Sequence, residues 1–233
     1  MHKLLLIRHG ESQWNHENRF TGWTNVGLTA KGIEQAKKAG SLISINGIHI
    51  DSVYCSFLKR AVKTCKICLD ELNLDNHKVI YDWRLNERHY GALQGLNKAE
   101  TAKKYGDDKV LKWRRSFDVA PPKMNINDDR HPLKDPLYND INPELLPSSE
   151  SLKDTLFRIK PLLDSVLFPK IINGDNVMVV AHGNSLRAIV KILKNLSNEE
   201  VIKLNIPTGA PYMLHLDSKL KVRKDYYLGN KQV

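Results

Sequence analysis

Short apolar runs of β type alternate along this chain with stretches in which apolar residues recur every three or four positions. The helical period is clearest over residues 58–72 and 152–166, and a third such stretch, 33–43, follows Thr29, a residue type suited to an N-cap. The runs of β type are residues 3–7, 50–55, 78–81, 176–181 and 211–216. Alternation of this kind is typical of parallel sheets covered by helices. We therefore predict an α/β fold, a three-layer sandwich with a mainly parallel β-sheet and helices on both faces.

One segment, residues 116–147, interrupts the alternation. It contains six of the ten prolines and shows no regular period. A stretch of that length without secondary structure is usually functional or disordered in a compact domain. We interpret it as an insertion that lies over the edge of the sheet, and not as a linker. Because 233 residues suit one large domain, we predict a single domain over 1–233.

The charge and the apolar runs narrow the class of partner. The formal net charge is +10, and the basic residues are spread along the chain with no run longer than two. Nucleic acid, an anionic membrane or small polyanions would all suit such a charge. Because no nucleic-acid-binding motif is present, we favour phosphorylated small molecules and predict no specific nucleic-acid partner. No apolar run approaches the length of a membrane helix or of a signal-peptide core, so we predict no membrane association and a cytoplasmic protein.

The cysteines raise the question of a metal site. Cys65 and Cys68 have the spacing of half a zinc site, but no second pair of Cys or His with ligand spacing lies nearby. Both fall on the apolar stripe of the helix predicted over 58–72. Since free cysteines tend to be buried, we predict that they are reduced core residues and expect no metal.

Two runs of β type end in the same way. "LLLIRHGES" at 4–12 and "VMVVAHGNS" at 177–185 each combine a strand, a His-Gly pair and a serine. Ligands of open parallel sheets bind outside the carboxyl ends of the strands. If these two strands are neighbours, His9 and His182 face the same crevice. A single histidine at a strand end is more often structural, but two in matching contexts favour function.

Basic residues follow the same strand ends. Guanidinium groups chelate phosphate in a planar fork that lysine cannot match, and helix N-termini after the glycines would add backbone donors for an anion. Any one of these arginines alone is as easily explained as a solvated surface charge. The residues concerned are Arg8, Arg60, Arg88, Lys98, Arg114 and Arg115, with Glu87 among them.

Six segments taken together resemble a known family. They are "LIRHGES", "NRFTGWTNVGLTAKG", "RAVKT", "LNERHYGALQGLNKAE", "WRRSFDVAPP" and "VAHGNSLRA". In this order they are similar to the histidine phosphatase superfamily, and more narrowly to its 2,3-bisphosphoglycerate-dependent phosphoglycerate mutases. The resemblance implies a phosphoglycerate mutase-like fold and interconversion of 3-phosphoglycerate and 2-phosphoglycerate through a phosphohistidine. It further implies 2,3-bisphosphoglycerate as the phosphoryl primer, no metal, and a homodimer or homotetramer.

The resemblance also implies a role for each matching residue. His9 corresponds to the nucleophile, Glu87 to the general acid and base, and Arg8, Arg60 and His182 to groups that hold the phosphoryl oxygens. Arg8 beside His9 would oppose a second positive charge and keep the imidazole neutral. The remaining substrate-binding positions correspond to Ser12, Asn15, Thr21, Gly22, Arg88, His89, Tyr90, Lys98, Arg114, Arg115, Gly183 and Asn184.

The same histidine chemistry leaves several functions open. A phosphohistidine can pass its phosphoryl group to water, as in phosphatases, or to a glycerate hydroxyl, and bisphosphoglycerate synthases share most of the motifs. The 116–147 insertion and the basic cluster favour the mutase. Such mutases generally continue past "YYLGN" with a lysine- and alanine-rich tail, whereas this sequence stops at 231–233. We therefore expect a short C-terminal tail and more hydrolysis than in tailed relatives. An inactive binding module would need replacement of His9, Glu87 or His182, and all three are present.

Overall fold

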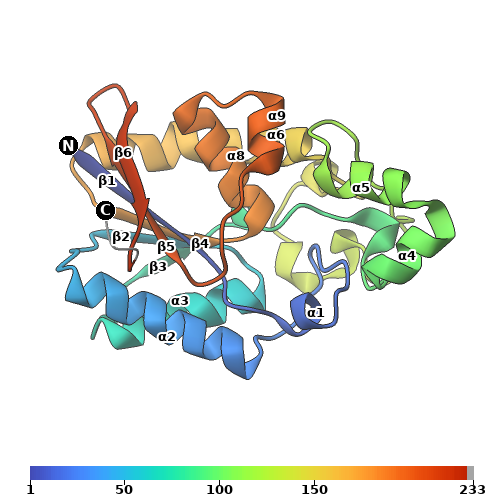
Figure 1. Ribbon diagram of the computed structural model, residues 1–233, viewed down its shortest axis with the longest axis horizontal. Coiled ribbons are helices and arrows are strands. Elements are labelled where there is room, and N and C mark those ends of the chain that lie inside the picture. The colour runs from blue at the N-terminus through green and yellow to red at the C-terminus, as the bar shows by residue number, and fades with distance from the viewer. Residues whose placement is uncertain (230–233) are drawn as a thin grey trace.

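A six-stranded sheet forms the centre of the computed structural model, which describes residues 1–229 (Figure 1). The predicted short tail ends at 231–233, which lie outside the described residues. The sheet order is β3-β2-β4-β1-β5-β6. The first four strands in this order run parallel, and β5 and β6 are antiparallel additions at one side. The strands are β1 (His2–Arg8), β2 (Ser52–Cys55), β3 (Val79–Tyr81), β4 (Val177–Ala181), β5 (Pro211–Leu216) and β6 (Val222–Tyr227).

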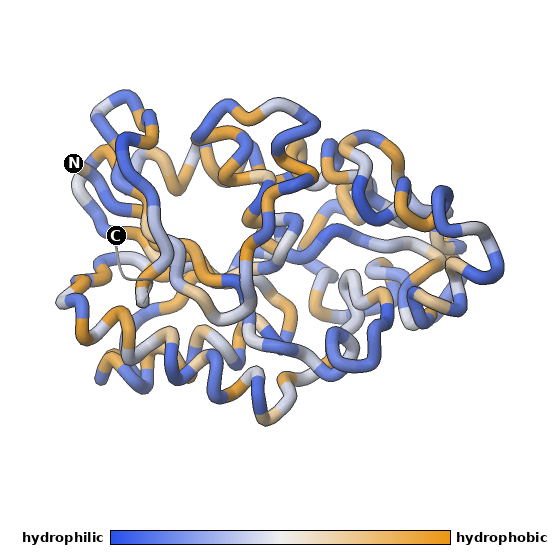
Figure 2. The backbone as a smooth tube through the Cα atoms, in the orientation of Figure 1, coloured by the Kyte–Doolittle hydropathy of each residue, from blue (hydrophilic) through white to orange (hydrophobic). Residues whose placement is uncertain are grey.

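Helices cover both faces of this sheet, so the predicted three-layer α/β fold is confirmed (Figure 1). Along each helical layer hydrophobic residues alternate with hydrophilic ones, as Figure 2 shows. The helices are α1 (Gln13–His16), α2 (Ala30–Ile45), α3 (Lys59–Glu71), α4 (Lys98–Tyr105), α5 (Asp107–Arg115), α6 (Leu152–Leu162), α7 (Phe168–Ile172), α8 (Gly183–Lys194) and α9 (Asn198–Lys203). Thr29 caps α2, as predicted, by accepting a hydrogen bond from the Gly32 amide. Within residues 1–229, no helix has the length and apolar character to span a membrane.

The two faces of β1 show why the middle of the sheet is buried. Leu4 and Leu6 pack in the cluster formed with α6 and α8, while Leu5 and Ile7 pack in the cluster formed with α2 and α3. All four side chains are at most 1% exposed. A strand covered on both faces reads as an unbroken apolar run, which explains the sequence pattern. The three cysteines are free and buried in the cluster on the α2 and α3 side, as predicted for Cys65 and Cys68.

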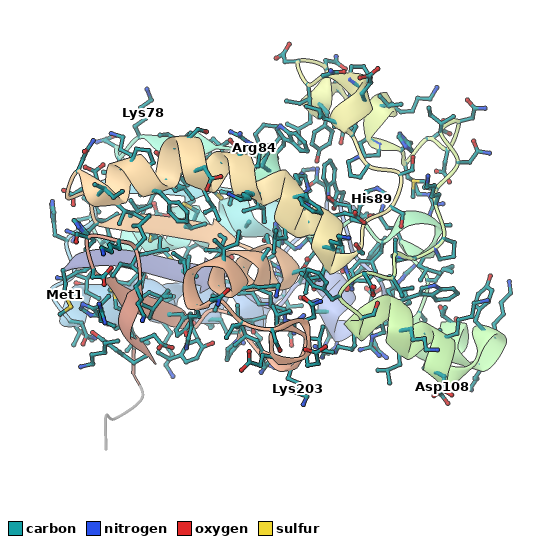
Figure 3. The ribbon with its side chains drawn as sticks, turned by 90° about the horizontal axis from the view of Figure 1, so that it is seen from above. Met1, Lys78, Arg84, His89, Asp108 and Lys203 are labelled. Carbon is teal, nitrogen blue, oxygen red and sulfur yellow. The ribbon has the colours of Figure 1, made fainter. Side chains whose placement is uncertain are left out.

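The 116–147 segment packs beyond the carboxyl ends of β2 and β3. It contains three short 3₁₀ helices, each with a proline in its first turn: η3 (Pro132–Lys134), η4 (Pro136–Tyr138) and η5 (Pro143–Leu145). Tyr138 and Leu146 pack in one cluster with Trp23 and Leu58. The segment therefore covers the loops at the ends of these strands. Helices α4 and α5 extend the molecule further, so Asp108 and Met1 lie at opposite ends (Figure 3).

Candidate functional site

His9 and His182 lie side by side at the carboxyl end of the sheet. Strands β1 and β4 are neighbours in parallel register, with Arg8 opposite Ala181, which fulfils the condition set by the sequence pattern. The His9 amide donates to the Ala181 carbonyl at 3.0 Å. The two imidazole rings are 4.9 Å apart between centroids. The repeated His-Gly motif therefore builds one site from two distant segments.

Gly10 allows the chain to leave β1 directly after the histidine. A Cβ at this position would lie 2.1 Å from the Gly32 carbonyl oxygen at the start of α2. The Gly10 amide also donates to Thr64 Oγ1 on α3. The turn after His9 is thus held between α2 and α3, and any larger residue would push it out of place.

The hydrogen bonds of His9 assign its tautomer. Nδ1 lies 2.6 Å from the Gly10 carbonyl oxygen, and Nε2 lies 3.3 Å from Nε of Arg60. A carbonyl oxygen only accepts and a guanidinium only donates. His9 therefore carries its proton on Nδ1 and presents a lone pair at Nε2, which is the form of imidazole that attacks an electrophile.

The surroundings of His9 keep it in this neutral form. Burial, followed by the charges of Arg60 and Arg8, lowers the pKa of His9 well below the usual value of 6.5. The arginine beside the histidine has the effect expected from the sequence, although burial is the larger cause. The imidazole is consequently a free nucleophile at neutral pH.

Hydrogen bonds through Ser56 and Asn86 hold the ring of His182 in place. Its Nε2 lies 2.8 Å from Ser56 Oγ, which in turn donates to Asn86 Oδ1 at 2.8 Å. Since the Ser56 hydroxyl proton is used there, Nε2 of His182 is the donor. Nδ1 is buried and has no hydrogen-bond partner among residues 1–229. Burial, Arg60 and His9 lower the pKa of His182 well below 6.5, so this ring too is neutral.

Glu87 lies in the same site and is ionised. One of its oxygens, Oε1, accepts from the Arg88 amide (2.8 Å), the Asn184 amide (3.1 Å) and Nδ2 of Asn184 (2.9 Å). Burial acts to raise the pKa of Glu87, but the Arg88 N–H bond, the charge of Arg60, the Asn184 bond and the charge of Arg8 outweigh it. The pKa lies below the ordinary value.

These groups line a cavity of about 150 Å³. Seven lining residues carry cations and, in the part of the chain that the structure describes, Glu87 is the one carboxylate on its wall. Such a charge balance suits a small, highly charged anion. The predicted residues on the wall are Arg8, His9, Asn15, Thr21, Gly22, Arg60, Glu87, Tyr90, Lys98, Arg114, Arg115, Gly183 and Asn184.

Four predicted site residues lie off the cavity wall. The Ser12 hydroxyl caps α1 by accepting from the Asn15 amide, and His89 packs edge-on against Trp23. Arg88 donates to the Tyr90 hydroxyl and the Arg114 carbonyl, behind the wall. His182 contacts the ring of His9 from beneath. The side chains of Ser12 and His89 are thus used by the fold, and their contact with substrate stays a prediction.

The wall also includes residues that the sequence analysis did not select: Arg19, Phe20, Arg187 and Asn205. Arg19 and Phe20 belong to the quoted "NRFTG" segment. Arg187 follows Asn184 by three residues, and this spacing places both on one face of a helix. If a helix is predicted to begin at Gly183, this spacing indicates that Arg187 lies beside Asn184.

Arg158 of α6 holds the loop that carries Glu87. Its guanidinium pairs with Glu150 through contacts of 2.6 and 2.9 Å, and Glu150 also accepts from the His89 amide. Both charged side chains are at most 5% exposed. Arg158 further donates to the carbonyl oxygens of Trp83, Arg84, Asn86 and Glu87. The loop that carries Glu87 is thus attached to α6 through its backbone.

Removal of this arginine is expected to destabilise the whole protein. In the Arg158→Met variant Glu150 stays buried without its partner, which costs about 3–5 kcal/mol of unfolding free energy. Urea unfolding followed by circular dichroism measures the change. Arg223→Met is the matched control, because its partner Asp217 is a surface group, and such pairs contribute about 0–1 kcal/mol. Equal losses of unfolding free energy in the two variants would contradict the role assigned to the buried Arg158–Glu150 ion pair.

Fold and site together define the class of protein: residues 4–226 match the "Histidine phosphatase superfamily (branch 1)", and the chain belongs to this superfamily. Solved structures support the fold, including "Mycobacterial hydrolase 1" (TM-score 0.75, 22% identity, 98% of each chain). "Bacillus stearothermophilus YhfR" gives a TM-score of 0.71 at 22% identity, over 95% of this chain and 94% of that one.

Within the superfamily the chain belongs with the 2,3-bisphosphoglycerate-dependent phosphoglycerate mutases. The enzyme of that name, numbered 2, from Bacteroides thetaiotaomicron is 53% identical over 100% of this chain and 94% of the relative. The relative from Porphyromonas gingivalis is 54% identical with the same coverage. The relative from Borreliella burgdorferi is 54% identical over 99% of this chain and 93% of its own. The family predicted from the motifs is confirmed.

Proposed function

We propose that this protein is a phosphoglycerate mutase, which interconverts 3-phosphoglycerate and 2-phosphoglycerate through a phosphohistidine at His9. One observation carries this function. A buried neutral imidazole, whose unprotonated Nε2 is contacted by Arg60, lies at a cavity with seven cations and a single ionised carboxylate. The full-length relatives at 53–54% identity carry the same activity in their names.

Each half-reaction uses the same two side chains. Starting from phosphorylated His9, the ionised Glu87 takes the proton of a glycerate hydroxyl, whose oxygen forms the new bond to phosphorus while the N–P bond breaks. Nε2 of His9 then attacks a phosphorus of the resulting bisphosphoglycerate, the N–P bond forms again, and the P–O bond breaks as Glu87 returns that proton to the leaving oxygen. Transfer to and from different hydroxyls moves the phosphoryl group between carbons 3 and 2.

The guanidinium groups supply the stabilisation that a phosphoryl transfer needs. Arg8 and Arg60 flank His9, where charge on the transferring oxygens is greatest. Nε of Arg8 is buried without a hydrogen-bond partner among residues 1–229, so an anion in the cavity would satisfy it. Lys98, Arg114 and Arg115 line the same cavity and would hold the second phosphate and the carboxylate.

The residues therefore fit 2,3-bisphosphoglycerate, which supplies the phosphoryl group that primes His9. We propose that no metal takes part, because the cations of the cavity neutralise the phosphoryl charge. We further propose a cytoplasmic enzyme that forms a homodimer or homotetramer, with residues 1–233 as a single mutase-like domain. The match to the family over residues 4–226 supports this last point.

Product analysis tests the function directly. With 3-phosphoglycerate as substrate, catalytic amounts of 2,3-bisphosphoglycerate should raise the rate of 2-phosphoglycerate formation at least tenfold, because His9 must first be phosphorylated. Ion-exchange separation of 2-phosphoglycerate, bisphosphoglycerate and inorganic phosphate measures the outcome. Inorganic phosphate as the main product would identify a phosphatase, and bisphosphoglycerate as the main product a synthase.

A further inference from the structure

Arg187 contacts Glu87 indirectly, through the side chain of Asn184. Its Nη1 donates to Oδ1 of Asn184 at 3.2 Å, and its Nε donates to the Leu204 carbonyl at 2.7 Å. The amide of Asn184 then donates from Nδ2 to Glu87 Oε1 at 2.9 Å. A chain of two hydrogen bonds thus runs from the guanidinium to the carboxylate.

This chain removes an ambiguity in the orientation of the amide. An asparagine side chain can present either its oxygen or its nitrogen to a neighbour, since the two ends have nearly the same shape. With the amide reversed, its oxygen would face the Glu87 carboxylate and its NH₂ would face the Arg187 guanidinium. Both contacts would be repulsive. Arg187 is a donor without acceptor capacity, so it selects the orientation in which Nδ2 points to Glu87.

Arg187 is itself held in place for this purpose. Asn184 and Arg187 lie three residues apart on α8, and the bond to Leu204 fixes the guanidinium from the other side, close to α9. Burial lowers the pKa of Arg187 to about 10, and the neighbouring Arg115 acts in the same direction. The side chain consequently stays charged at neutral pH and keeps donating.

The bonds to Glu87 are distributed unevenly between its two oxygens. Oε1 accepts all three of the N–H bonds described above, while no hydrogen bond joins Oε2 to the residues between 1 and 229. The charges around the carboxylate come from separate elements: Arg8 from β1, Arg60 from α3, Lys98 from α4 and Arg187 itself from α8. Only the Asn184 side-chain bond depends on a rotatable amide.

We propose that Arg187 is a positioning residue, which locks the Asn184 amide so that Glu87 is held by Oε1 and exchanges the substrate proton through Oε2. The inference rests on the proposed function for the step that Glu87 performs. The motif "VAHGNSLRA" contains both Asn184 and Arg187, but it does not show that their side chains are linked. The guanidinium acts through Asn184 and has no part in the reacting atoms.

The effect of Arg187 is measurable on Glu87 itself. In the Arg187→Met variant Glu87 alone orients the amide, so the hydrogen bond from Nδ2 to the ionised carboxylate is weaker. The midpoint of the Glu87 titration should rise by up to about one pH unit, the size expected for the complete loss of one hydrogen bond to a charged group. ¹³C NMR of the carboxyl carbon in the ligand-free protein reports this midpoint, with Glu87→Gln providing the assignment.

A double-mutant cycle separates positioning from a direct effect. The charges of Arg187 and Glu87 also interact directly, so the comparison is between two sizes of effect. If Arg187 acts through the amide, Arg187→Met moves the midpoint clearly more in the native background than in an Asn184→Ala background. If only its charge acts on Glu87 through space, the midpoint moves equally in both backgrounds. That result would overturn the proposal. Arg187→Lys, which keeps one donor, should restore part of the native midpoint and serves as the test if the methionine variant folds poorly.

Kinetics provide the second arm of the experiment. The acid limb of the pH profile of kcat/KM should move upward in Arg187→Met, because Glu87 must be ionised to accept the hydroxyl proton. KM for 3-phosphoglycerate should rise as well, since Arg187 lines the cavity, so the shift of the limb is the readout of positioning. A rise in KM alone, with an unmoved NMR midpoint, would make Arg187 a substrate-binding residue and refute the positioning role. Since the NMR midpoint needs no turnover, it is independent of whether the mutase assignment holds.

Discussion

The His9→Ala variant is expected to lose both mutase activity and the ability to become labelled with phosphate. The Nε2 lone pair is the acceptor of the phosphoryl group, and the neighbouring His182 cannot replace it, because the His182 ring is buried off the cavity wall. The fall in kcat should be on the order of 10⁶-fold, the scale seen when an enzyme loses its nucleophile. Coupled assays of 2-phosphoglycerate and labelling with ³²P-bisphosphoglycerate measure the two losses.

The controls for this variant use another histidine and another pH. His16 is exposed at the end of α1, so His16→Ala should keep its labelling and its turnover. In the native protein, labelling should persist as the pH falls through 6.5, where an ordinary histidine becomes protonated. The sign follows from the lowered pKa of His9, since the imidazole stays neutral below that value. Stable phosphorylation of the His9→Ala protein would contradict the assignment of the nucleophile.

The sheet and the paired histidines could be predicted because their signals are local. A strand segment buried on both faces must be apolar at every position, as Leu4–Ile7 of β1 and all of β4 are. Two such strands that end in His-Gly can share a crevice only as neighbours. Strand β6 escaped prediction because it lies at the sheet edge and its sequence, "VRKDYY", is mixed. Charged residues suit an edge strand, where they discourage pairing with other chains.

The cavity was only partly predictable, since a motif position does not show where its side chain points. Ser12 and His89 have the chemistry of ligand-binding residues, yet one caps a helix and the other packs against Trp23. Arg187 shows the opposite case. Its place on the cavity wall depends on α8 beginning at Gly183. The sequence alone does not decide whether a loop or a helix follows His182. The pKa of Glu87 likewise depends on hydrogen bonds that only the folded chain assembles.

The Glu87→Gln variant is expected to bind substrate normally but to transfer slowly. A glutamine oxygen can still accept the bonds from Arg88 and Asn184, so the loop should keep its shape. Its NH₂ group can neither supply nor take the proton that the glycerate hydroxyl exchanges. We expect kcat to fall by about 10²–10⁴-fold, the usual contribution of a general acid or base, with KM nearly unchanged. Steady-state assays in both directions measure the split.

A change of leaving group isolates the missing proton. The p-nitrophenolate ion leaves without protonation, so phosphorylation of His9 by p-nitrophenyl phosphate should survive in Glu87→Gln as a rapid burst, followed by stalled turnover. The slow second step follows because water, like a glycerate hydroxyl, must lose a proton to attack. Glu11→Gln is the control, since Glu11 pairs with Lys31 outside the cavity, and its turnover should stay near the native value. A burst lost as completely as the mutase activity would assign Glu87 to phosphate binding, because proton transfer matters little to this leaving group.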